Sequence, residues 1–460
     1  MVDRDRRPDS RTRRRDFLKG TAAAGGAAAL AGCQGSIARS IVTGEPPQAG
    51  DDTFRIGALG PEVKALGESI GNGAKLAAEQ LNAQGGGIGG KQVEVLTGNT
   101  RGLPGKAEQE YRRLVAEENC DMTIGTFRTT ALNAILPLIA DSQRIHMTTG
   151  AAGPRPARLV NEQYERYKYH FRPGPINSFD LADAQLEFTK AKAGDFGWET
   201  AAVLVENFDA LRPFAERLRP IQEVLDVPIF TKTSTNVRTW QPIFDQVAQA
   251  GADICFVFLA LTGTKAVTQW ANKQYPFEMG GIHVFGQQPN YWEATGGRCE
   301  ALFTMNAMTP QTRNTERTQK FMKRYMEAFG GAPMYNGPIS FDAVNMYNEA
   351  VENVGGTEDT DGIINYLEQM EYTNGTIIPR FEFRGPDAKF AHDPVYGGFE
   401  TGVPVYQQWQ EAPSTSDKGI SVESGGVQES FYPPQSVSTE EGATYPDNKS
   451  ADYVKPPWMR

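Results

Sequence analysis

Few residues in the chain could do covalent chemistry. Residues 67–71 read GESIG, which matches the G-x-S-x-G pattern of a serine nucleophile, with Ser69 at its centre. Such a serine acts from a sharp turn that joins a strand to a helix. Here the preceding residues are typical of a loop, and Ser69 falls near the start of a predicted amphipathic helix. We therefore expect no nucleophile at Ser69, and keep a serine hydrolase as an alternative function.

Residues 85–90 read GGGIGG and contain the pattern G-x-G-x-x-G. In dinucleotide-binding proteins that pattern lies between a strand and a helix. Here it lies between a predicted helix and a predicted strand, which is the reverse order. The segment therefore predicts a turn and no nucleotide cofactor.

The metal-ligating residue types are also dispersed. The chain has four histidines and four cysteines, and no CxxC or H-E-x-x-H spacing. His146 and His283 lie in apolar, strand-like runs, which favours hydrogen-bonded positions in the core. Cys255 lies in the run ADICFVFLA, which predicts a buried thiol. We expect no catalytic residue, no metal and no cofactor.

The start of the chain carries a different kind of signal. Arg14 and Arg15 begin the segment RRDFLK, which resembles the twin-arginine export motif. The apolar stretch 21–31 is too short to cross about 30 Å of hydrocarbon. Residues 30–33 (LAGC) resemble a lipobox, in which Cys33 would carry the lipid. These features predict an exported protein anchored to the membrane surface through Cys33.

The charge balance constrains possible partners. The chain of 460 residues has a net charge of −10. Residues 1–33 contain eight Lys/Arg and four Asp/Glu, a surplus of four positive charges, so the remainder carries −14. Nucleic-acid binding requires a basic surface. We therefore predict no nucleic-acid partner.

Two successive α/β patterns follow this start. In the first, strands alternate with helices at short intervals, which predicts a parallel sheet covered by helices. Its expected strands are 54–59, 91–99, 121–125 and 144–150, and its expected helices are 70–81, 107–115 and 129–141. The second pattern has expected strands at 200–207, 227–234, 252–260 and 281–286, with a helix at 214–225. Further expected elements are helices at 315–330 and 341–354 and short strands at 380–384 and 403–410.

The segments GAKLAAEQLNAQGGGIGGKQVEVL and MTIGTFRTTALNAILPLIADSQRIHMTTGAAGP are the most specific in the body of the chain. With FRIGALGP, AAVLVEN and SFDAVNMYNEAV, they resemble solute-binding proteins of the branched-chain amino acid type. The resemblance covers roughly residues 54–410. It implies the type I periplasmic-binding fold: two Rossmann-like α/β lobes with parallel sheets, joined by a hinge of three crossings.

The resemblance also implies domain boundaries. Residues 1–33 would be the signal peptide and 34–52 a flexible tether. Lobe one would comprise 54–173 and 306–375, and lobe two 174–305 and 376–412. Residues 413–460, which are polar and rich in Pro and Ser, are expected to form an extended tail on the surface.

In the family, a ligand carboxylate is held by a hydroxyl and backbone N–H groups in two loops of lobe one. The first loop matches Thr129 and Thr130, and the second matches Gly150, Ala151 and Ala152. The physical basis is sound, because free N–H groups at a helix N-terminus attract anions. Thr129 also begins a predicted helix, so its hydroxyl could serve as a helix cap, and both roles stay open.

Other ligand positions depart from the pattern of amino-acid binders. Leu66 and Leu211 stand where aromatic residues are frequent, and Gln288 matches the acidic partner of an α-ammonium group. A buried ammonium without a carboxylate partner is unfavourable by several kcal/mol. A neutral group such as an amide or urea would suit Gln288 better, and Arg128 could instead favour an organic anion.

Together these patterns predict an extracytoplasmic receptor of an ABC importer. It would capture a small polar solute, such as a branched-chain amino acid, an amide or urea, between its lobes. Its expected partners are that solute, the separate permease subunits and the membrane that holds its lipid. A ligand-sensing receptor of the same fold is an alternative.

Overall fold

The computed structural model describes residues 53–61, 64–402, 404–412, 425–436 and 452–460. The strands within these residues are β1 (Thr53–Gly60), β2 (Gln92–Asn99), β3 (Met122–Gly125), β4 (His146–Thr148), β5 (His170–Phe171), β6 (Thr200–Glu206), β7 (Asp226–Thr233), β8 (Ile254–Leu259), β9 (Glu278–His283), β10 (Phe303–Asn306), β11 (Glu371–Tyr372), β12 (Phe381–Glu382), β13 (Val405–Glu411) and β14 (Gly426–Tyr432).

The helices range in length from 4 residues in α5 to 20 residues in α1. They are α1 (Lys64–Ala83), α2 (Pro104–Arg112), α3 (Thr129–Ser142), α4 (Arg155–Glu162), α5 (Tyr164–Tyr167), α6 (Ser178–Phe196), α7 (Leu211–Arg217), α8 (Gln241–Gln249), α9 (Thr264–Lys273), α10 (Tyr291–Thr295), α11 (Thr318–Phe329), α12 (Asn336–Val354) and α13 (Thr360–Gln369).

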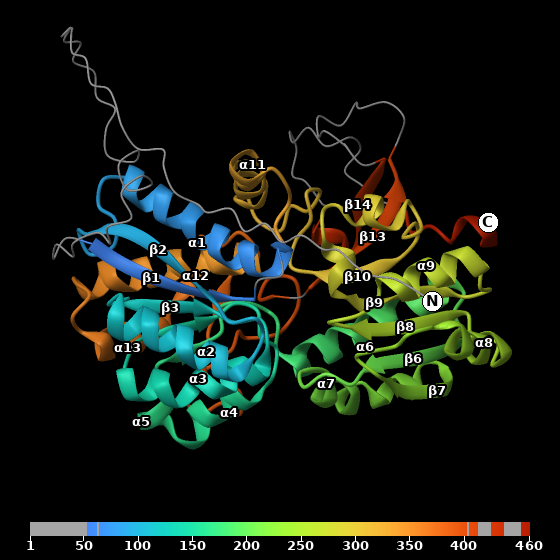
Figure 1. Cartoon of the computed structure of the whole chain (residues 1–460), viewed down its shortest axis with the longest axis horizontal. Coiled ribbons are helices and arrows are strands. Elements are labelled where there is room, and N and C mark those ends of the chain that lie inside the picture. The colour runs from blue at the N-terminus through green and yellow to red at the C-terminus, as the bar shows by residue number, and fades with distance from the viewer. Residues whose placement is uncertain (1–52, 62–63, 403, 413–424, 437–451) are drawn as a thin grey trace, which may run out of the picture. The chain divides into compact units, whose positions relative to one another are not determined.

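Two main sheets organise these elements (Figure 1). The first has the order β2-β1-β3-β4-β5 and is parallel throughout. We call it lobe one, together with α1–α5 and α11–α13. The second has the order β14-β13-β10-β9-β8-β6-β7, in which β6–β10 are parallel and β13 and β14 are antiparallel additions. We call it lobe two, together with α6–α10. The predicted α/β class is confirmed; the sheet of lobe one is parallel as predicted, and that of lobe two is mixed.

Helices cover both faces of each sheet, because the strands are apolar on both sides. In lobe one, α1 packs against α12 and α2 packs against α3. In lobe two, α6 packs against α7 and α8 against α9. Strand β8 illustrates the pattern: Phe256 and Phe258 belong to one apolar cluster, while Cys255 and Val257 belong to another. Cys255 is fully buried as a free thiol, as predicted.

The GGGIGG segment forms the turn between α1 and β2, as predicted. The backbone N–H of Ile88 bonds to the carbonyl of Lys91, and the reverse bond is also made. Gly87 has φ +57°, and a Cβ there would lie 1.8 Å from the Lys91 carbonyl oxygen. Glycine is required at this position because no side chain fits.

Two parts of the chain differ from expectation. The expected surface tail is wrong for Gly426–Tyr432, which forms β14 and pairs with β13 in the sheet of lobe two. Its polar side chains are buried there: Gln428 and Ser430 lie inside the fold. Ile377 and Phe381, which were expected in lobe two, pack in the apolar cluster of lobe one.

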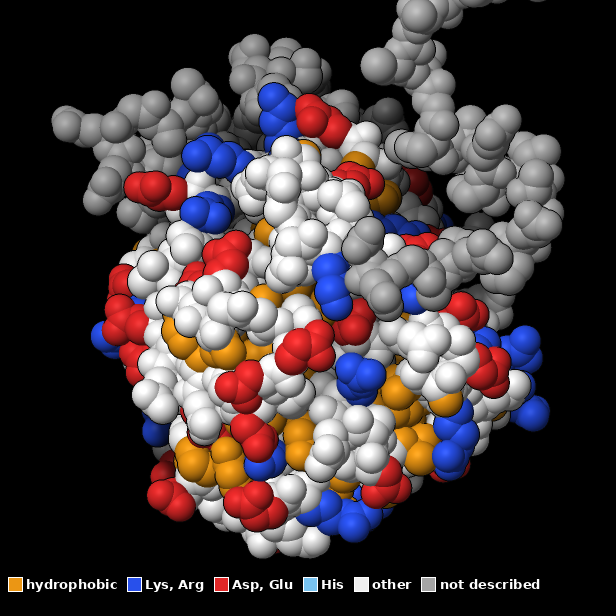
Figure 2. All heavy atoms as spheres, turned by 90° about the vertical axis from the view of Figure 1, so that its left-hand side faces the viewer, with side chains coloured by type: hydrophobic (Ala, Val, Ile, Leu, Met, Phe, Trp, Pro, Cys, Tyr) orange, Lys and Arg blue, Asp and Glu red, His pale blue; other side chains and the backbone are white. Residues whose placement is uncertain are grey.

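The surface agrees with the mixed composition. Figure 2 shows acidic and basic side chains interspersed over the face formed by lobe one. That face of the described chain has no continuous basic stripe of the kind that nucleic-acid binding requires. Arg14, Arg15 and Cys33 lie outside the described residues, so the predicted export motif and lipid site stay predictions.

Candidate ligand-binding site

A cavity of about 90 Å³ lies where loops from the carboxyl ends of both sheets meet. In parallel α/β sheets, these ends are where ligands bind, because loops and helix N-termini gather there. Lobe one and the segment after β5 contribute Phe127, Gly150, Ala152, Pro175, Ile176 and Tyr335. From the strand ends of lobe two come Phe208, Leu211, Ala260, Val284, Gln287 and Met305.

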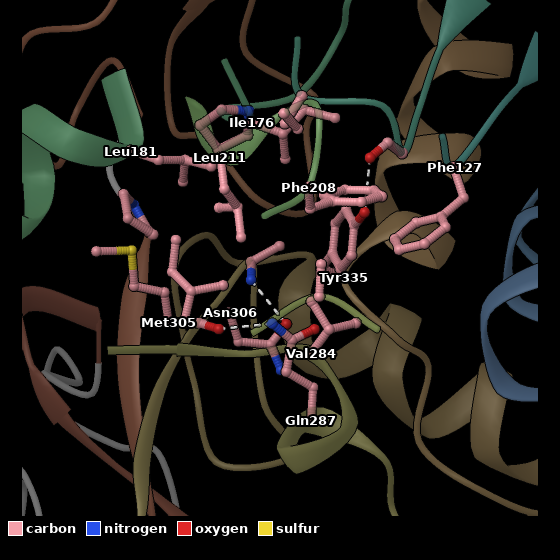
Figure 3. Close-up of a pocket in the computed structure, with 18 residues that line it drawn as sticks. Phe127, Ile176, Leu181, Phe208, Leu211, Val284, Gln287, Met305, Asn306 and Tyr335 are labelled. Atoms are coloured by element: carbon pink, nitrogen blue, oxygen red, sulfur yellow. Dashed lines mark hydrogen bonds between the residues drawn. The ribbon is translucent and has the colours of Figure 1, made fainter. Parts of the chain in front are cut away.

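Most of the lining is apolar, and no charged side chain of the described residues lines the cavity. Figure 3 shows the labelled side chains converging from both lobes. Phe127 and Phe208 stack with their ring centroids 6.3 Å apart. The Tyr335 hydroxyl donates a hydrogen bond to the Gly150 carbonyl at 2.6 Å. Burial raises the pKa of Tyr335, so its phenol is neutral at physiological pH.

Besides the Tyr335 phenol, two amides provide polar side chains in the lining. The Nδ2 group of Asn306 donates to Oε1 of Gln407 at 2.8 Å, and its Oδ1 accepts from the Ala307 N–H at 2.8 Å. The Nε2 group of Gln287, in the 3₁₀ turn Val284–Gln287, donates to the Met305 carbonyl at 2.7 Å. A carbonyl can only accept, so this bond fixes the orientation of the Gln287 amide. Its Oε1 is buried and has no hydrogen-bond partner among the described residues.

The predicted anion-binding loops are used within the protein. The Thr129 hydroxyl accepts a hydrogen bond from the Gly153 N–H at 3.0 Å, which ties the first loop to the second. The Thr130 N–H, in the first turn of α3, donates to Oδ2 of Asp209 at 2.9 Å. Asp209 belongs to lobe two, where it follows β6. The helix-cap role expected of Thr129 is not observed, because its hydroxyl accepts from the Gly153 N–H of another loop and no side chain caps the start of α3.

The other predicted ligand residues divide into two groups. Gly150, Ala152 and Leu211 line the cavity. Leu66, Ala151 and Gln288 are not among the lining residues, and neither are Thr129 and Thr130. Leu66 is buried in the apolar cluster of lobe two although it comes from α1. Ala151 is buried in the cluster of lobe one, and the neighbour of Gln288, Gln287, faces the cavity. Ligand contact by these residues stays a prediction.

Ser69 has a structural role. It is 2% exposed, and its hydroxyl accepts from the Met334 N–H at 3.0 Å and lies 3.3 Å from the Met334 carbonyl. It lies within α1 and does not follow a strand directly. The alternative of a serine nucleophile at this position is therefore wrong.

The buried histidines are hydrogen-bonded, as predicted for His146 and His283. His146 bonds through Nδ1 to the Thr123 hydroxyl and through Nε2 to the Gly125 carbonyl. His283 accepts from the Gly286 N–H at 2.8 Å. Burial lowers the pKa of His146 to about 3 and that of His283 to about 4. No group of metal-ligating side chains occurs among the described residues.

Sequence reasoning missed the aromatic residues of the site. Phe127, Phe208 and Tyr335 each lie just beyond a strand or just before a helix. The available signal was position, because the residues after β3 and β6 lie at carboxyl strand ends, where ligand sites form. Gln287 lies after β9 by the same rule.

The fold and cavity define a two-lobed α/β binding protein. A model of the periplasmic binding protein family matches residues 53–397, and the chain belongs to this family. The family consists of extracytoplasmic binding proteins, so the chain is a binding protein and not an enzyme. Among the described residues, no helix has the length and apolar character needed to cross a membrane. A search of curated protein sequences found no match.

Solved structures share the fold at low sequence identity. A putative branched-chain amino acid ABC transporter protein from Silicibacter pomeroyi has 18% identity and a TM-score of 0.70, over 89% of this chain and 100% of that one. A solute-binding protein of an ABC transporter from Rhodopseudomonas palustris, in complex with 3,4-dihydroxybenzoic acid, has 18% identity and a TM-score of 0.64, over 88% and 99%. The protein LivJ from Streptococcus pneumoniae, in complex with isoleucine, has 15% identity and a TM-score of 0.63, over 78% and 96%.

Proposed function

We propose that this chain is the extracytoplasmic solute-binding receptor of an ABC importer. It captures a small solute in the cavity between its lobes and delivers it to a separate permease. The observation that carries the proposal is the cavity itself, which is lined from both lobes at the carboxyl ends of both sheets. A ligand held there contacts both lobes at once, and so stabilises their closed arrangement.

The similar structures support this class of function. They include ABC transporter binding proteins with isoleucine bound in one and 3,4-dihydroxybenzoic acid in another. An amino acid presents an ammonium group, which requires a carboxylate partner when buried. The lining of this cavity offers amide and backbone groups but no carboxylate among the described residues. Within the predicted range of solutes, this favours an amide over a branched-chain amino acid.

The export and anchoring predictions complete the proposal. Arg14 and Arg15 direct export, and Cys33 carries the lipid that keeps the receptor at the membrane beside its permease. Replacing Cys33 with Ser is expected to release the protein from the membrane fraction. Replacing both arginines with Lys is expected to retain it in the cytoplasm. Unchanged fractionation of both variants would refute this part of the proposal without affecting the binding function.

Binding is tested by calorimetric titration of the purified protein with leucine, isoleucine, benzoate, short amides and urea. The variant Ala152→Phe places a ring in the cavity and is expected to abolish binding of any solute that the wild type takes. Ala250→Phe is the matched control, because Ala250 is the partly exposed C-cap of α8 in lobe two and does not line the cavity. Equal binding by wild type and Ala152→Phe would show that the solute binds elsewhere.

Transport is tested by uptake of the bound solute, labelled, in cells with and without the gene. Loss of uptake on deletion, restored by the wild type but not by Ala152→Phe, supports the importer assignment. Solute binding with unchanged uptake would instead favour a sensory receptor.

A further inference from the structure

Two short segments face each other beside the cavity. Phe127 and Arg128 follow β3 in lobe one, and Phe208 and Asp209 follow β6 in lobe two. In each pair the aromatic residue lines the cavity. Figure 3 shows Phe127 and Phe208 side by side, with Tyr335 next to them. The Arg128 guanidinium lies over the Phe208 ring, 4.9 Å from its centroid. The two pairs therefore form one contact between the lobes at the edge of the cavity.

The charged members of the pairs meet at the start of α3. Oδ2 of Asp209 accepts the Thr130 N–H at 2.9 Å, and its Oδ1 lies 3.6 Å from the Arg128 guanidinium. A helix N-terminus has free N–H groups and attracts an anion. In this structure the anion is a carboxylate of the opposite lobe. The nearby Thr129 hydroxyl accepts a hydrogen bond from the Gly153 N–H, and Thr129 is not among the residues that line the cavity.

The cavity itself provides nothing that would balance a charge. Its described lining has no charged side chain, and burial of an unpaired charge is strongly unfavourable. One polar side-chain atom of the described lining does lack a partner: Oε1 of Gln287, a residue that is 4% exposed. Because the amide is oriented by the Met305 carbonyl, this oxygen stays an acceptor. A solute with an O–H or N–H donor would satisfy it.

We infer that Asp209 is a specificity-determining residue that latches the lobes together. Its carboxylate takes the place at the N-terminus of α3 that an anionic solute would need. The cavity then closes on a small, uncharged and mainly apolar solute that offers one hydrogen-bond donor to Gln287, such as an alcohol or a primary amide. This solute class rests on the proposed binding function, whereas the latch is a property of the protein alone.

The latch is tested without any solute, by hydrogen exchange at the Thr130 amide. Asp209→Ala removes the acceptor and is expected to speed exchange of this amide at least tenfold. Asp209→Asn keeps an acceptor oxygen and is expected to change exchange less. Asp183→Asn is the control, because it breaks the ion pair with Arg217, whose N–O distance is 2.6 Å, inside lobe two. Exchange in Asp209→Ala equal to that in the control would overturn the latch.

Specificity is tested with three solutes of one carbon skeleton: isovaleramide, 3-methyl-1-butanol and isovalerate. We expect the wild type to bind the amide or the alcohol at least tenfold more tightly than the carboxylate. In Asp209→Ala, the ratio of isovalerate to isovaleramide affinity is expected to rise at least tenfold, and in Asp183→Asn it stays constant. The acceptor role of Gln287 is tested by Gln287→Leu, which is expected to weaken binding of the amide and of the alcohol at least fivefold.

Three results would overturn the assigned solute class: tight isovalerate binding by the wild type, an unchanged ratio in Asp209→Ala, or no binding of any of the three. The proposed receptor function is judged separately, by binding of the wider solute panel and its loss in Ala152→Phe. A chain that binds leucine or benzoate through this cavity would keep the receptor function and lose the specificity inference.

Discussion

Glu206 and Asp209 come from the same end of β6, yet their carboxylates have different surroundings. Glu206 is 1% exposed and stays within lobe two, where it accepts the N–H groups of Ala260 and Leu261 and the Thr262 hydroxyl. Asp209 is partly exposed and reaches into lobe one, to Thr130 and Arg128. The Glu206 carboxylate stabilises one side of the site, and the Asp209 carboxylate joins the two lobes. Proximity in sequence therefore does not imply a shared role.

The largest effect on stability is expected from removing the Glu206 carboxylate. Glu206→Ala leaves two backbone N–H groups and a hydroxyl unpaired, and should lower the free energy of unfolding by roughly 3–5 kcal/mol. Urea unfolding measures the change. Glu206→Gln keeps an acceptor oxygen and should lose about half as much. A loss below about 1 kcal/mol in Glu206→Ala would mean that the Ala260–Thr262 loop does not depend on this carboxylate.

Lowering the pH should destabilise the lobe-one side of the contact between the lobes. His146 supports Gly125, just before Phe127 and Arg128. Burial lowers the pKa of His146 from 6.5 to about 3. Between these values the unfolded chain binds a proton that the folded chain does not. Stability contributed by the neutral ring is therefore complete above pH 6.5 and falls as the pH drops toward 3, by up to about 1.4 kcal/mol per pH unit.

The contribution of His146 is measured as a difference in stability between the wild type and a variant, because other groups also titrate. Burial raises the pKa of Asp342 to about 7, which gives a slope of opposite sign as that carboxyl takes up its proton. Urea unfolding of the wild type and of His146→Gln at pH 7, 6 and 5 separates the two. The variant should start less stable and lose less on acidification. Parallel curves would contradict the assignment to His146.

The smallest expected effect concerns the ion pair of Asp209. Its ion pair with Arg128 spans 3.6 Å, and the two side chains are 25% and 28% exposed. Solvent screens such pairs, so a double-mutant cycle of Arg128→Gln and Asp209→Asn should give a coupling below about 1 kcal/mol. The coupling should decrease further at 1 M salt. A coupling of several kcal/mol that is insensitive to salt would show that the ion pair, rather than the Thr130 hydrogen bond, dominates the latch.

The sequence was sufficient for the repeated α/β pattern, because hydrophobic periodicity determines both the elements and the buried faces. One helical stripe was predicted at Phe341, Val344, Tyr347, Val351 and Val354; the first four are buried on α12, and Val354, at its end, is partly buried. Strand β14 was missed because its sequence, GVQESFY, has three consecutive polar residues, Gln428, Glu429 and Ser430, which break the apolar alternation of a typical strand and yet are buried. Pairing with β13, the preceding strand, satisfies its backbone, but the polar composition of the segment gave no sign of this pairing.

The site was predicted only in part, for a related reason. Gly150, Ala152 and Leu211 were placed by resemblance, and they do line the cavity. The use of Thr130 by Asp209 depends on how two loops from different sheets come together. No periodicity or motif contains that information. A backbone N–H that is predicted to bind a ligand can therefore donate instead to a carboxylate that is distant in the sequence.

The order of strands in lobe two has a consequence for how the protein folds. Strand β10 pairs with β13, although the intervening chain builds α11–α13 of lobe one. A fragment ending near residue 305 would leave the edge of β10 unpaired, and such edges promote aggregation. Contacts so distant along the chain slow folding, because a large loop must close before they form. The two lobes should therefore fold as one cooperative unit, and neither should be obtainable as an independent fragment.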